Sequence, residues 1–541
     1  EQALDNGHIS SDFVGFRKAR QSWRIPAFLQ EFTKLVFDPV SGELLEHPDP
    51  TAIYSIRQIC LALKKYRAEC SPKRERAAME QFVLTDLEVA SFDSERPDHW
   101  LETFSDVAAY LFGPVLHDLD YMLDVDPDAI VPRHGPGATA NRIKANAKYD
   151  SLVWTKRLQE HFPADKFLVP NEGFSKRLSE VNFQSPRDET PVRVVSVPKT
   201  LKTPRIIGIE PVHMQYVQQG LLERLAFALQ RRVMFDAIGI RDQGLNQAMA
   251  RSSSKAGDLA TLDLSEASDR VSNQLVLALF RHFPKLGAMV QSCRSTHADV
   301  PGHGIIPLAK FASMGSALCF PVEAMVFLTI AFMGAKRSGP TRLQWGRKSF
   351  LQSVRIYGDD IIVPVDMAQS VTSELEAFGL KVNRSKSFGK GKFRESCGGD
   401  FYNGTAVKPL YVKTKLPRSR QHMEEIVCTS AFRNHAYLAG LKNVVAYIDK
   451  QMERVAPYPF VSDKSPVIGR LGEGSSKMKL CPLTHVPLVR GLIPRTKTPL
   501  SRLDDAGALM KFFLKRGLDP IFSEDHLQYA GRPRSADVRL E

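Results

Sequence analysis

The sequence predicts an α+β fold divided into several domains. Three observations support this: helical periodicity over most of the first 150 residues, paired β-rich runs between 191 and 211, and alternating strand and helix patterns from there to 413. The chain has 541 residues, of which 43% are hydrophobic, so it can bury several cores. A chain of this length should hold about three or four domains or subdomains.

The individual segments follow from local patterns. TAIYSIRQICLALKKYRAEC (51–70) has apolar residues at three- and four-residue intervals, which predicts a helix. RHGPGATAN (133–141) combines two glycines with a proline, which predicts a loop. PVRVVSVPK and PRIIGIEP, separated by TLKT, predict a strand pair within 191–211, and a helical stretch follows from about 212 to 235. The region 414–541 mixes helix patterns with Pro-rich connectors and carries no chemical motif that we could name.

Composition narrows the class of protein. Lys and Arg number 73 against 60 Asp and Glu, a net charge of +13 that favours a polyanionic partner, although a merely soluble basic protein would show the same excess. The seven cysteines form no CxxC pair, which indicates reduced thiols rather than a disulfide or zinc framework. We expect no membrane span, because no apolar run approaches the required ~18 residues, and EQALDNGHIS at the start does not resemble a secretory signal.

The segment SVRIYGDDIIVP (353–364) predicts a hairpin whose two-residue turn is Gly358-Asp359, with glycine at the first turn position. Asp359 and Asp360 are then adjacent carboxylates at the tip of two buried strands. Their mutual repulsion would be relieved by a divalent cation such as Mg²⁺, which takes one or two carboxylates and fills its other positions with water and substrate phosphates. A plain exposed turn would tolerate the same residues, so this short string is by itself weak evidence for a metal site.

A third carboxylate is predicted in LATLDLSEASDRVSNQLVLALF (259–280). LATLDL alternates as a strand, Ser265 or Ser268 is a candidate cap for the helix that follows, and Asp263 lies at the strand's end. Taken alone, Asp263 could be a cap or turn residue. Together with the acidic hairpin it completes a set of three carboxylates, which can hold two metal ions about 4 Å apart, one activating an attacking hydroxyl and one stabilising the leaving oxygen.

Two further segments suggest a nucleotide site. In FASMGSALCFPVEAMVF (311–327), Ser313 and Gly315 precede a helical run, where small residues allow close approach of a sugar or phosphate. An ordinary loop into a core helix would look similar.

The second segment is VPKTLKTPRIIGIEP (197–211). Lys199, Lys202 and Arg205 cluster at the predicted hairpin, where they could hold a polyphosphate facing the acidic site. A solvated basic turn is the alternative for these three residues.

In combination, these segments resemble the catalytic β subunit of the replicases of small positive-strand RNA bacteriophages, the leviviruses, which are right-hand RNA-directed RNA polymerases. The resemblance is ordered along the chain from roughly 190 to 413. RDQGLNQ (241–247) and FRESCG are particularly similar to phage replicases. The motifs are TLDLSEASDRVS for motif A, FASMGSALCFPVE for B, IYGDDIIVP for C, GLKVNRSKSF for D, FRESCGGDFYNGTAVKPLYVK for E and VPKTLKTPRIIGIEP for F.

The resemblance implies a division into fingers, palm and thumb. Fingers would come from 1–255, mostly helical and including the basic hairpin 191–211. The palm would span 256–413, an antiparallel sheet backed by helices and carrying motifs A–E, with part of the fingers interleaved around 285–310. The thumb and C-terminal region would span 414–541.

The resemblance also implies roles for named residues. Two Mg²⁺ ions, for which Mn²⁺ or Ca²⁺ could substitute in binding, would be held at Asp263, Leu264, Asp359 and Asp360. A growing strand's 3′ hydroxyl would attack the α-phosphate of a nucleotide, and Lys386 would protonate the leaving pyrophosphate. The nucleotide-binding set would be Lys199, Lys202, Arg205, Asn246, Ser268, Asp269, Ser313 and Gly315. Asp269 follows Asp263 by six residues where many polymerases have five, so either Ser268 or Asp269 could sense the ribose 2′-hydroxyl.

Motif B departs from the family pattern at three positions. Ser316 stands where Asn is usual and Cys319 where Thr is usual, which weakens the expected hydrogen bonding to the nucleotide. Pro321 would cost about 3 kcal/mol in mid-helix, so the helix is predicted to begin near 319 or to kink there.

The predicted function is therefore primer-independent copying of single-stranded viral RNA from its 3′ end, in the cytoplasm of an infected bacterial host. Expected partners are template and product RNA, NTPs and no membrane, with host elongation factors Tu and Ts and an mRNA-binding ribosomal protein as candidates. A reverse transcriptase, a non-enzymatic basic RNA-binding protein and an inactive polymerase relic remain alternatives.

Overall fold

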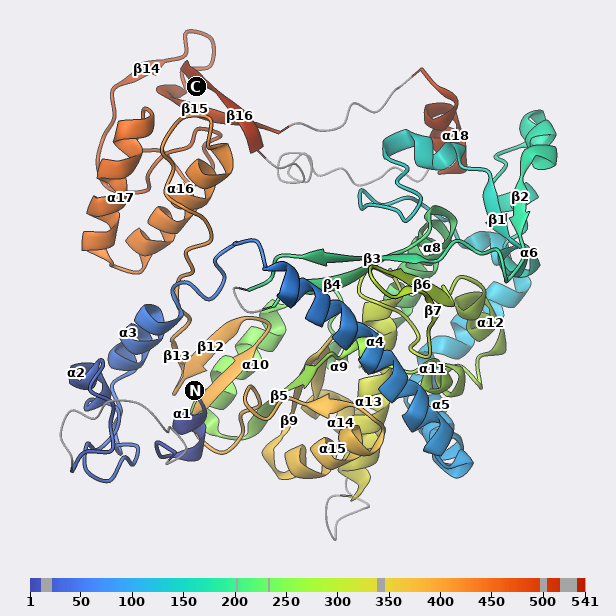
Figure 1. The fold of residues 1–541 in the computed structure, drawn as a ribbon, viewed down its shortest axis with the longest axis horizontal. Helices are drawn as coiled ribbons and strands as arrows, with labels where there is room; N and C mark the ends of the chain where they lie inside the picture. Colours follow the sequence, from blue (N-terminus) through green and yellow to red (C-terminus); the bar gives the residue numbers. More distant parts are fainter. Residues whose placement is uncertain are drawn as a thin grey trace.

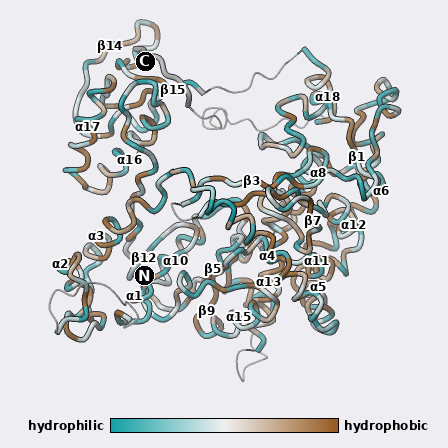
Figure 2. Tube along the Cα trace, viewed as in Figure 1, coloured by the Kyte–Doolittle hydropathy of each residue, from teal (hydrophilic) through white to brown (hydrophobic). Residues whose placement is uncertain are grey.

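The computed structural model confirms a mixture of helices and small sheets, as the α+β prediction requires (Figure 1). Hydrophobic segments concentrate where α5 (Asp98–Val125), α11 (Asn273–Leu279) and α13 (Cys319–Arg337) meet (Figure 2). The structure describes residues 1–10, 22–200, 203–231, 234–337, 346–496, 504–515 and 533–540.

The sheet that carries the acidic motifs is antiparallel and four-stranded, in the order β10-β5-β9-β8. Within it, Asp263 lies opposite Asp360, and Tyr357 pairs with Asp360 on the other side. This register leaves Gly358 and Asp359 as the hairpin turn, so that prediction is confirmed. The strands are β5 (Leu259–Ser265), β8 (Arg355–Tyr357), β9 (Asp360–Pro364) and β10 (Lys381–Val382).

Helix α13 is the central helix of the largest hydrophobic core, where it packs against α15 (Val365–Ala377) and α5. It is long and apolar enough to cross a membrane, but 89% of its apolar window is buried inside the protein, as expected for a core helix. The helix begins at Cys319 as predicted, which places Pro321 in the first turn, where its missing N–H breaks no helical hydrogen bond. Figure 1 shows α13, α14 (Arg347–Ser353) and α15 beside the acidic sheet.

A second four-stranded sheet, in the order β4-β3-β6-β7, holds the basic hairpin. β3 (Val192–Val197) and β4 (Arg205–Ile209) form the predicted antiparallel pair. β3 also pairs in parallel with β6 (His297–Val300), which forms a hairpin with β7 (Gly304–Pro307). Residues 297–307 therefore join the sheet of the basic hairpin, next to α4 (Pro72–Glu95), whose Met79 and Phe82 share a core with Val192 and Ala298.

Described residues among the first 61 positions pack on the motif E segment. Leu4, Ile53 and other N-terminal apolar residues share a core with Phe393 and Tyr402. The backbone N–H groups of residues 389–391 donate to Asp5, and Arg57 forms an ion pair with Asp400. These elements are α1 (Gln2–Asn6), α2 (Gln30–Thr33), α3 (Pro50–Leu61), β11 (Phe393–Ser396), β12 (Gly399–Tyr402) and β13 (Thr405–Ala406). The assignment of fingers, palm and thumb stays a prediction.

The described residues from Met423 to Thr496, together with β16, form a separate group of elements at the upper left of Figure 1, around a core that contains Met423, Ile448 and Met452. It comprises α16 (Met423–Leu438), α17 (Lys442–Val455), β14 (Met478–Leu480), β15 (Pro487–Thr496) and β16 (Pro533–Leu540). The remaining elements are η1 (Pro127–Ala129), η2 (Ala145–Asp150), β1 (Val153–Thr155), α6 (Lys156–His161), α7 (Ala164–Phe167), η3 (Glu172–Glu180), β2 (Asn182–Gln184), α8 (Val212–Leu229), α9 (Met234–Ala237), α10 (Gly244–Ala256), η4 (Ser268–Arg270), α12 (Pro284–Ser292) and α18 (Ala506–Leu514).

Three local predictions need correction. The helix expected over 51–70 ends at Leu61, because the chain beyond it bonds instead to the end of the motif E segment, through Val412 N to Ala62 O and Arg67 N to Lys413 O. The helix expected to reach 235 ends at Leu229. The cap of α11 is neither Ser265, which lies in β5, nor Ser268, which turns toward Glu323.

The observed cap of α11 is Ser272, whose side chain accepts from Leu275 N at 3.2 Å. The loop predicted at 133–141 is present, with neither helix nor strand.

Candidate active site

The acidic centre consists of Asp263 at the end of β5 and the Asp359-Asp360 pair at the tip of the β8–β9 hairpin. Burial and the charge of Asp359 raise the pKa of Asp360 to about 6. Burial also raises the pKa of Asp263, and Asp359 adds to this rise while Lys386 opposes it. Asp359 therefore disfavours the ionised forms of Asp263 and Asp360, and a cation placed among the carboxylates would stabilise those forms.

One side of Asp263 is occupied by residues of motif D. Lys386 Nζ lies 3.2 Å from Asp263 Oδ2, and Asn383 Nδ2 donates to the same oxygen at 3.1 Å. Burial alone would lower the pKa of Lys386, but the Asp263 carboxylate outweighs it and raises the pKa. Lys386 is thus a protonated amine at the acidic centre. Sequence reasoning missed Asn383, although it lies three residues before Lys386 in the same motif.

In the described part of the chain, no group of three His, Cys, Asp or Glu side chains is arranged to hold a metal ion. The metal prediction for Asp263, Leu264, Asp359 and Asp360 therefore stays a prediction. The donor chemistry fits Mg²⁺, which needs only one or two carboxylates when phosphates and water complete its shell. The Leu264 side chain is buried in the core, so only the backbone of this residue could take part.

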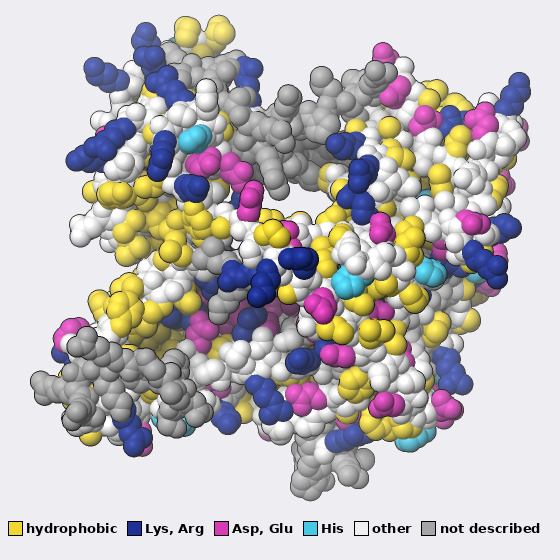
Figure 3. All heavy atoms as spheres, viewed as in Figure 1, with side chains coloured by type: hydrophobic (Ala, Val, Ile, Leu, Met, Phe, Trp, Pro, Cys, Tyr) yellow, Lys and Arg dark blue, Asp and Glu magenta, His cyan; other side chains and the backbone are white. Residues whose placement is uncertain are grey.

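The basic hairpin lies within electrostatic reach of the acidic centre. Burial, with help from Arg205 and Lys386, lowers the pKa of Lys199, while Asp359 and Asp263 counteract this effect. Arg205 begins β4 and is exposed, opposite Val197 in the hairpin. The third predicted cation, Lys202, lies outside the described residues. Figure 3 shows acidic side chains in a recessed part of the surface with Lys and Arg side chains beside them.

Motif B contributes a buried carboxylate that sequence reasoning missed. Glu323 on α13 is 5% exposed and accepts a hydrogen bond of 2.6 Å from the Ser268 hydroxyl. A Cβ at Gly358 would lie 3.2 Å from Glu323 Oε1, so this carboxyl group lies directly behind the acidic turn. Burial raises its pKa to about 8, which keeps it mostly protonated at neutral pH. A lone Glu in the apolar run CFPVEAMVF was the available signal.

The two candidate sugar-sensing residues have different partners. Asp269 forms an ion pair with Lys310, Nζ to Oδ1 2.9 Å, and the Lys310 side chain is fully buried with its Nζ 3.3 Å from the centre of the Phe82 ring. The Ser268 hydroxyl donates to the buried Glu323 carboxyl group. Both side chains already have a partner, but Asp269 is paired with a buried cation, whereas Ser268 is bonded to a mostly protonated carboxyl group. Ser268 is therefore the better placed of the two to exchange its hydrogen bond with a ligand.

The motif B loop is joined to the basic hairpin by close packing. Gly315 has φ +133°, and a Cβ there would overlap the carbonyl oxygen of Gly208 on β4. Gly208 N also donates to Met314 O at 3.0 Å. Ser313 is buried, and its hydroxyl has no hydrogen-bond partner among the described residues. The loop therefore carries a polar group that a ligand could satisfy.

Asn246 lies behind the sheet rather than in the site. It is fully buried, accepts from Arg355 Nε at 2.7 Å and donates to Ser396 Oγ at 3.5 Å. Ser396 in turn donates to Asp360 Oδ1 at 3.3 Å. Asn246 can thus support a nucleotide site only indirectly, through Ser396 and Asp360. Ser396 was also missed, although it belongs to the FRESCG string.

The central part of the chain is similar to known proteins. Residues 176–433, a little under half of the chain, match the family described as "RNA replicase, beta-chain". This match covers the basic hairpin and motifs A–E, and it confirms the resemblance to leviviral replicase β subunits over the central part of the chain.

Individual relatives extend this result. The chain is 37% identical over 220 residues to the "RNA-directed RNA polymerase beta chain" of Escherichia phage MS2 and 36% identical over 223 residues to that of Enterobacteria phage fr. Each match covers 41% of this chain but only 37% and 38% of the respective relative. A solved structure titled "RdRp complex" shares 12% identity at a TM-score of 0.40, covering 62% of this chain and 31% of that one, a likeness too weak to establish the fold.

Proposed function

We propose that this chain is an RNA-directed RNA polymerase that copies single-stranded phage RNA by nucleotidyl transfer. The observation that carries the proposal is the pairing of Asp263 with Asp360 across β5 and β9, with Asp359 on the adjoining turn. Lys386 and the basic hairpin face the same carboxylates. A non-enzymatic RNA-binding protein would have no need for carboxylates concentrated at the tip of two largely buried strands.

Asp263, Asp359 and Asp360, with the backbone of Leu264, would hold two Mg²⁺ ions. When bound, such ions lower the pKa of an attacking hydroxyl and stabilise charge on the leaving oxygen. Mn²⁺ or Ca²⁺ could replace Mg²⁺ in binding. The raised pKa values of Asp263 and Asp360 support this assignment, because a divalent cation would remove the like-charge repulsion that contributes to them.

The chain's own side chains would orient the nucleotide and handle the proton. Lys199 and Arg205, with Lys202 from the same hairpin, would bind the triphosphate as cations opposite the acidic centre. Lys386, protonated and beside Asp263, would give its proton to the departing pyrophosphate.

The sugar side of the nucleotide would be read by small polar groups. Ser268, Ser313 and the backbone at Gly315 would bind the ribose, and the 2′-hydroxyl would supply the partner that Ser313 lacks among the described residues. This selection favours NTPs over dNTPs and separates the proposal from a reverse transcriptase.

The biological setting follows from the resemblance of the motifs to phage replicases and is part of the proposal. Initiation would be primer-independent at the template 3′ end, and the protein would act in the cytoplasm of an infected bacterium. Host elongation factors Tu and Ts and an mRNA-binding ribosomal protein would be its partners.

The test is incorporation of labelled nucleotides on a C-rich single-stranded RNA, with and without host factors. Wild type should incorporate NTPs in Mg²⁺ and discriminate against dNTPs, and the product should keep the initiating 5′-triphosphate. Asp359→Asn should lower incorporation at least about 100-fold while RNA affinity is kept.

Asp366→Asn, the same change at an exposed position on α15, is the matched control and should leave activity unchanged. Equal product from wild type and Asp359→Asn would overturn the assignment, and preferential use of dNTPs would favour a reverse transcriptase.

A further inference from the structure

The chain's excess positive charge is concentrated near its C-terminus. The segment 414–496, which we call the C-terminal subdomain, contains 13 Lys and Arg residues against six Asp and Glu residues. Its surplus of seven charges is more than half of the +13 of the whole chain, in less than a sixth of its length. Such a density favours a polyanion at this subdomain itself, in addition to the basic hairpin near the acidic centre.

The C-terminal subdomain has a framework that can hold charged side chains in place. Its own core joins α16 and α17 through residues such as Ile426 and Met452. Arg433 on α16, 3% exposed at its side chain, forms two hydrogen bonds to Asp449 on α17, at 2.7 and 2.8 Å. The two helices are therefore fixed to each other by packing and by a buried ion pair.

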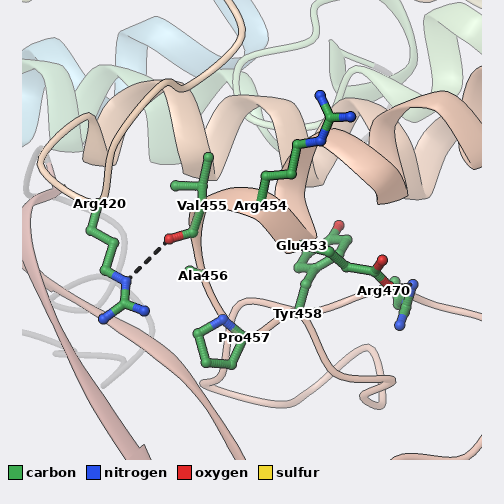
Figure 4. A pocket seen from close by; sticks show the side chains of 8 residues that line it. All are labelled: Arg420, Glu453, Arg454, Val455, Ala456, Pro457, Tyr458 and Arg470. Atoms are coloured by element: carbon green, nitrogen blue, oxygen red, sulfur yellow. Dashed lines mark hydrogen bonds and ion pairs between the residues drawn. The ribbon is translucent and has the colours of Figure 1, made fainter.

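A pocket of about 340 Å³ lies at the C-terminal end of α17. Three arginines contribute to its lining, Arg420, Arg454 and Arg470, against the single acid Glu453. Figure 4 shows Arg420 on one side of the pocket and Glu453 and Arg470 together on the other. A pocket of this volume can hold a phosphodiester group with its sugar.

Not all of these arginines are free to bind an anionic ligand. Arg470 is compensated by Glu453, 2.7 Å away, and its guanidinium lies over the Phe460 ring at 4.5 Å. Among the described residues, Arg420 makes one side-chain hydrogen bond, from Nε to Val455 O at 3.1 Å, and the residue is exposed. Arg454 is exposed and forms no ion pair with any described residue. The pocket thus has two cations without a counter-ion in the described chain, one of them oriented by the backbone.

We propose that this pocket binds the phosphate backbone of single-stranded RNA, at Arg420 and Arg454, as a contact separate from the acidic centre. The inference rests on the proposed function because RNA is the ligand, but it requires no reaction to take place in the pocket. A guanidinium presents a planar fork that matches two phosphate oxygens. Tyr458, the aromatic residue among the described lining residues, is 5% exposed and bonded through its hydroxyl to Ser430, so it offers no face for base stacking. Binding should therefore be independent of base identity.

The experiment measures RNA affinity in the full chain carrying Asp359→Asn, so that loss of synthesis and loss of binding cannot be confused. Fluorescence anisotropy with a labelled 20-nucleotide RNA is recorded over a salt series for Arg420→Gln/Arg454→Gln. We expect Kd to rise about five- to twentyfold at 0.1 M salt, and the salt slope to fall by about 1.4, for two lost phosphate contacts. Oligo(U) and oligo(C) should respond equally.

The matched control is Lys442→Gln, which removes one exposed charge at the opposite end of α17, about 18 Å away along the helix. It should change Kd less than twofold, compared with at least twofold for Arg454→Gln alone. Thermal unfolding of all variants should coincide with that of the parent, because the substituted side chains are exposed.

Several outcomes would overturn the inference. One is an unchanged Kd and salt slope for RNA in the double variant. Another is a loss of RNA affinity in Lys442→Gln equal to that in the double variant. A third is a double variant that loses ATP binding in equilibrium dialysis but keeps its RNA affinity. The last result would assign the pocket to free nucleotides. Loss of polyglutamate binding with RNA affinity intact would assign it to an acidic protein segment. Absence of RNA synthesis in wild type would contradict the proposed function but would not affect the measured RNA affinity of the pocket.

Discussion

The Ser268 hydroxyl donates a 2.6 Å hydrogen bond to Glu323 Oε2, and this bond links the segment after β5 to the first turns of α13. Glu323 lies behind the Gly358 turn, so one buried carboxyl group contacts motif A and lies against motif C. Because burial raises its pKa to about 8, the group is mostly neutral at pH 7 and holds Ser268 without adding negative charge to the acidic centre.

This bond predicts a specific effect on sugar selection. Glu323→Ala should leave Ser268 without its partner and lower the preference for ATP over dATP by up to about tenfold, the equivalent of one hydrogen bond. Glu323→Gln keeps an acceptor at the same place and should retain most of the preference. Comparing kcat/KM for ATP and dATP checks the prediction. A loss that is equal for both sugars would show that Glu323 acts only on the fold.

The Lys310–Asp269 pair predicts strong coupling in stability. Lys310→Met should lower the free energy of unfolding by about 3–5 kcal/mol, because it leaves the largely buried Asp269 carboxylate without its cation. Adding Asp269→Asn removes the unpaired charge and should restore a substantial part of the loss. Urea unfolding of the two single variants and the double variant measures the coupling, and simple additivity would contradict it.

The contact between Gly315 and Gly208 predicts intolerance to a single methyl group. Gly315→Ala should destabilise the protein by about 3 kcal/mol or more, since the new Cβ would overlap the Gly208 carbonyl oxygen. Gly302 is the matched control: it has φ +85° and a Cβ added there would have nothing within 4 Å, so Gly302→Ala should cost only about 1–2 kcal/mol. Urea unfolding compares the two, and similar losses would mean that backbone strain alone matters.

Glu210 predicts a pH dependence of stability away from the acidic centre. It is 2% exposed, accepts a 2.6 Å hydrogen bond from Ser295, and burial raises its pKa to about 7. The folded protein then binds a proton at the Glu210 carboxyl group more tightly than the unfolded chain does. The contribution of this proton to the free energy of unfolding is therefore full below about pH 4.5 and is lost as pH rises to about 7.

Glu210→Gln should remove this dependence. Relative to wild type, the variant should gain on the order of 3 kcal/mol between pH 4.5 and 8, measured by urea unfolding at each pH. Parallel stability profiles for the two proteins would contradict the prediction.

Local patterns predicted the parts of the site that are built from neighbouring residues. The alternation of LATLDL and the Gly358-Asp359 turn were sufficient to place Asp263 and Asp359 at strand ends, and the structure pairs the two strands in one sheet. The start of α13 at Cys319 also followed from a local rule, the exclusion of proline from a helix interior.

The residues that sequence reasoning missed are defined by contacts across the chain. Glu323 meets Ser268 across 55 positions, Lys310 meets Asp269 across 41, and Ser396 meets Asp360 across 36. Their burial also depends on the completed fold, and nothing in the local string distinguishes a paired buried charge from a solvated one. The α11 cap was misassigned for the same reason. Ser268 donates its hydrogen bond to Glu323, and the N-cap of α11 is Ser272.

The pairing between β5 and β9 makes the acidic centre depend on strand alignment as well as on residue identity. Since neighbouring side chains of a strand point to opposite faces, inserting or deleting one residue in either strand would turn Asp263 or Asp360 toward the apolar interior while leaving every acidic residue in the chain. An insertion or deletion of one residue at this place should therefore reduce the proposed activity more completely than replacing any single side chain around it.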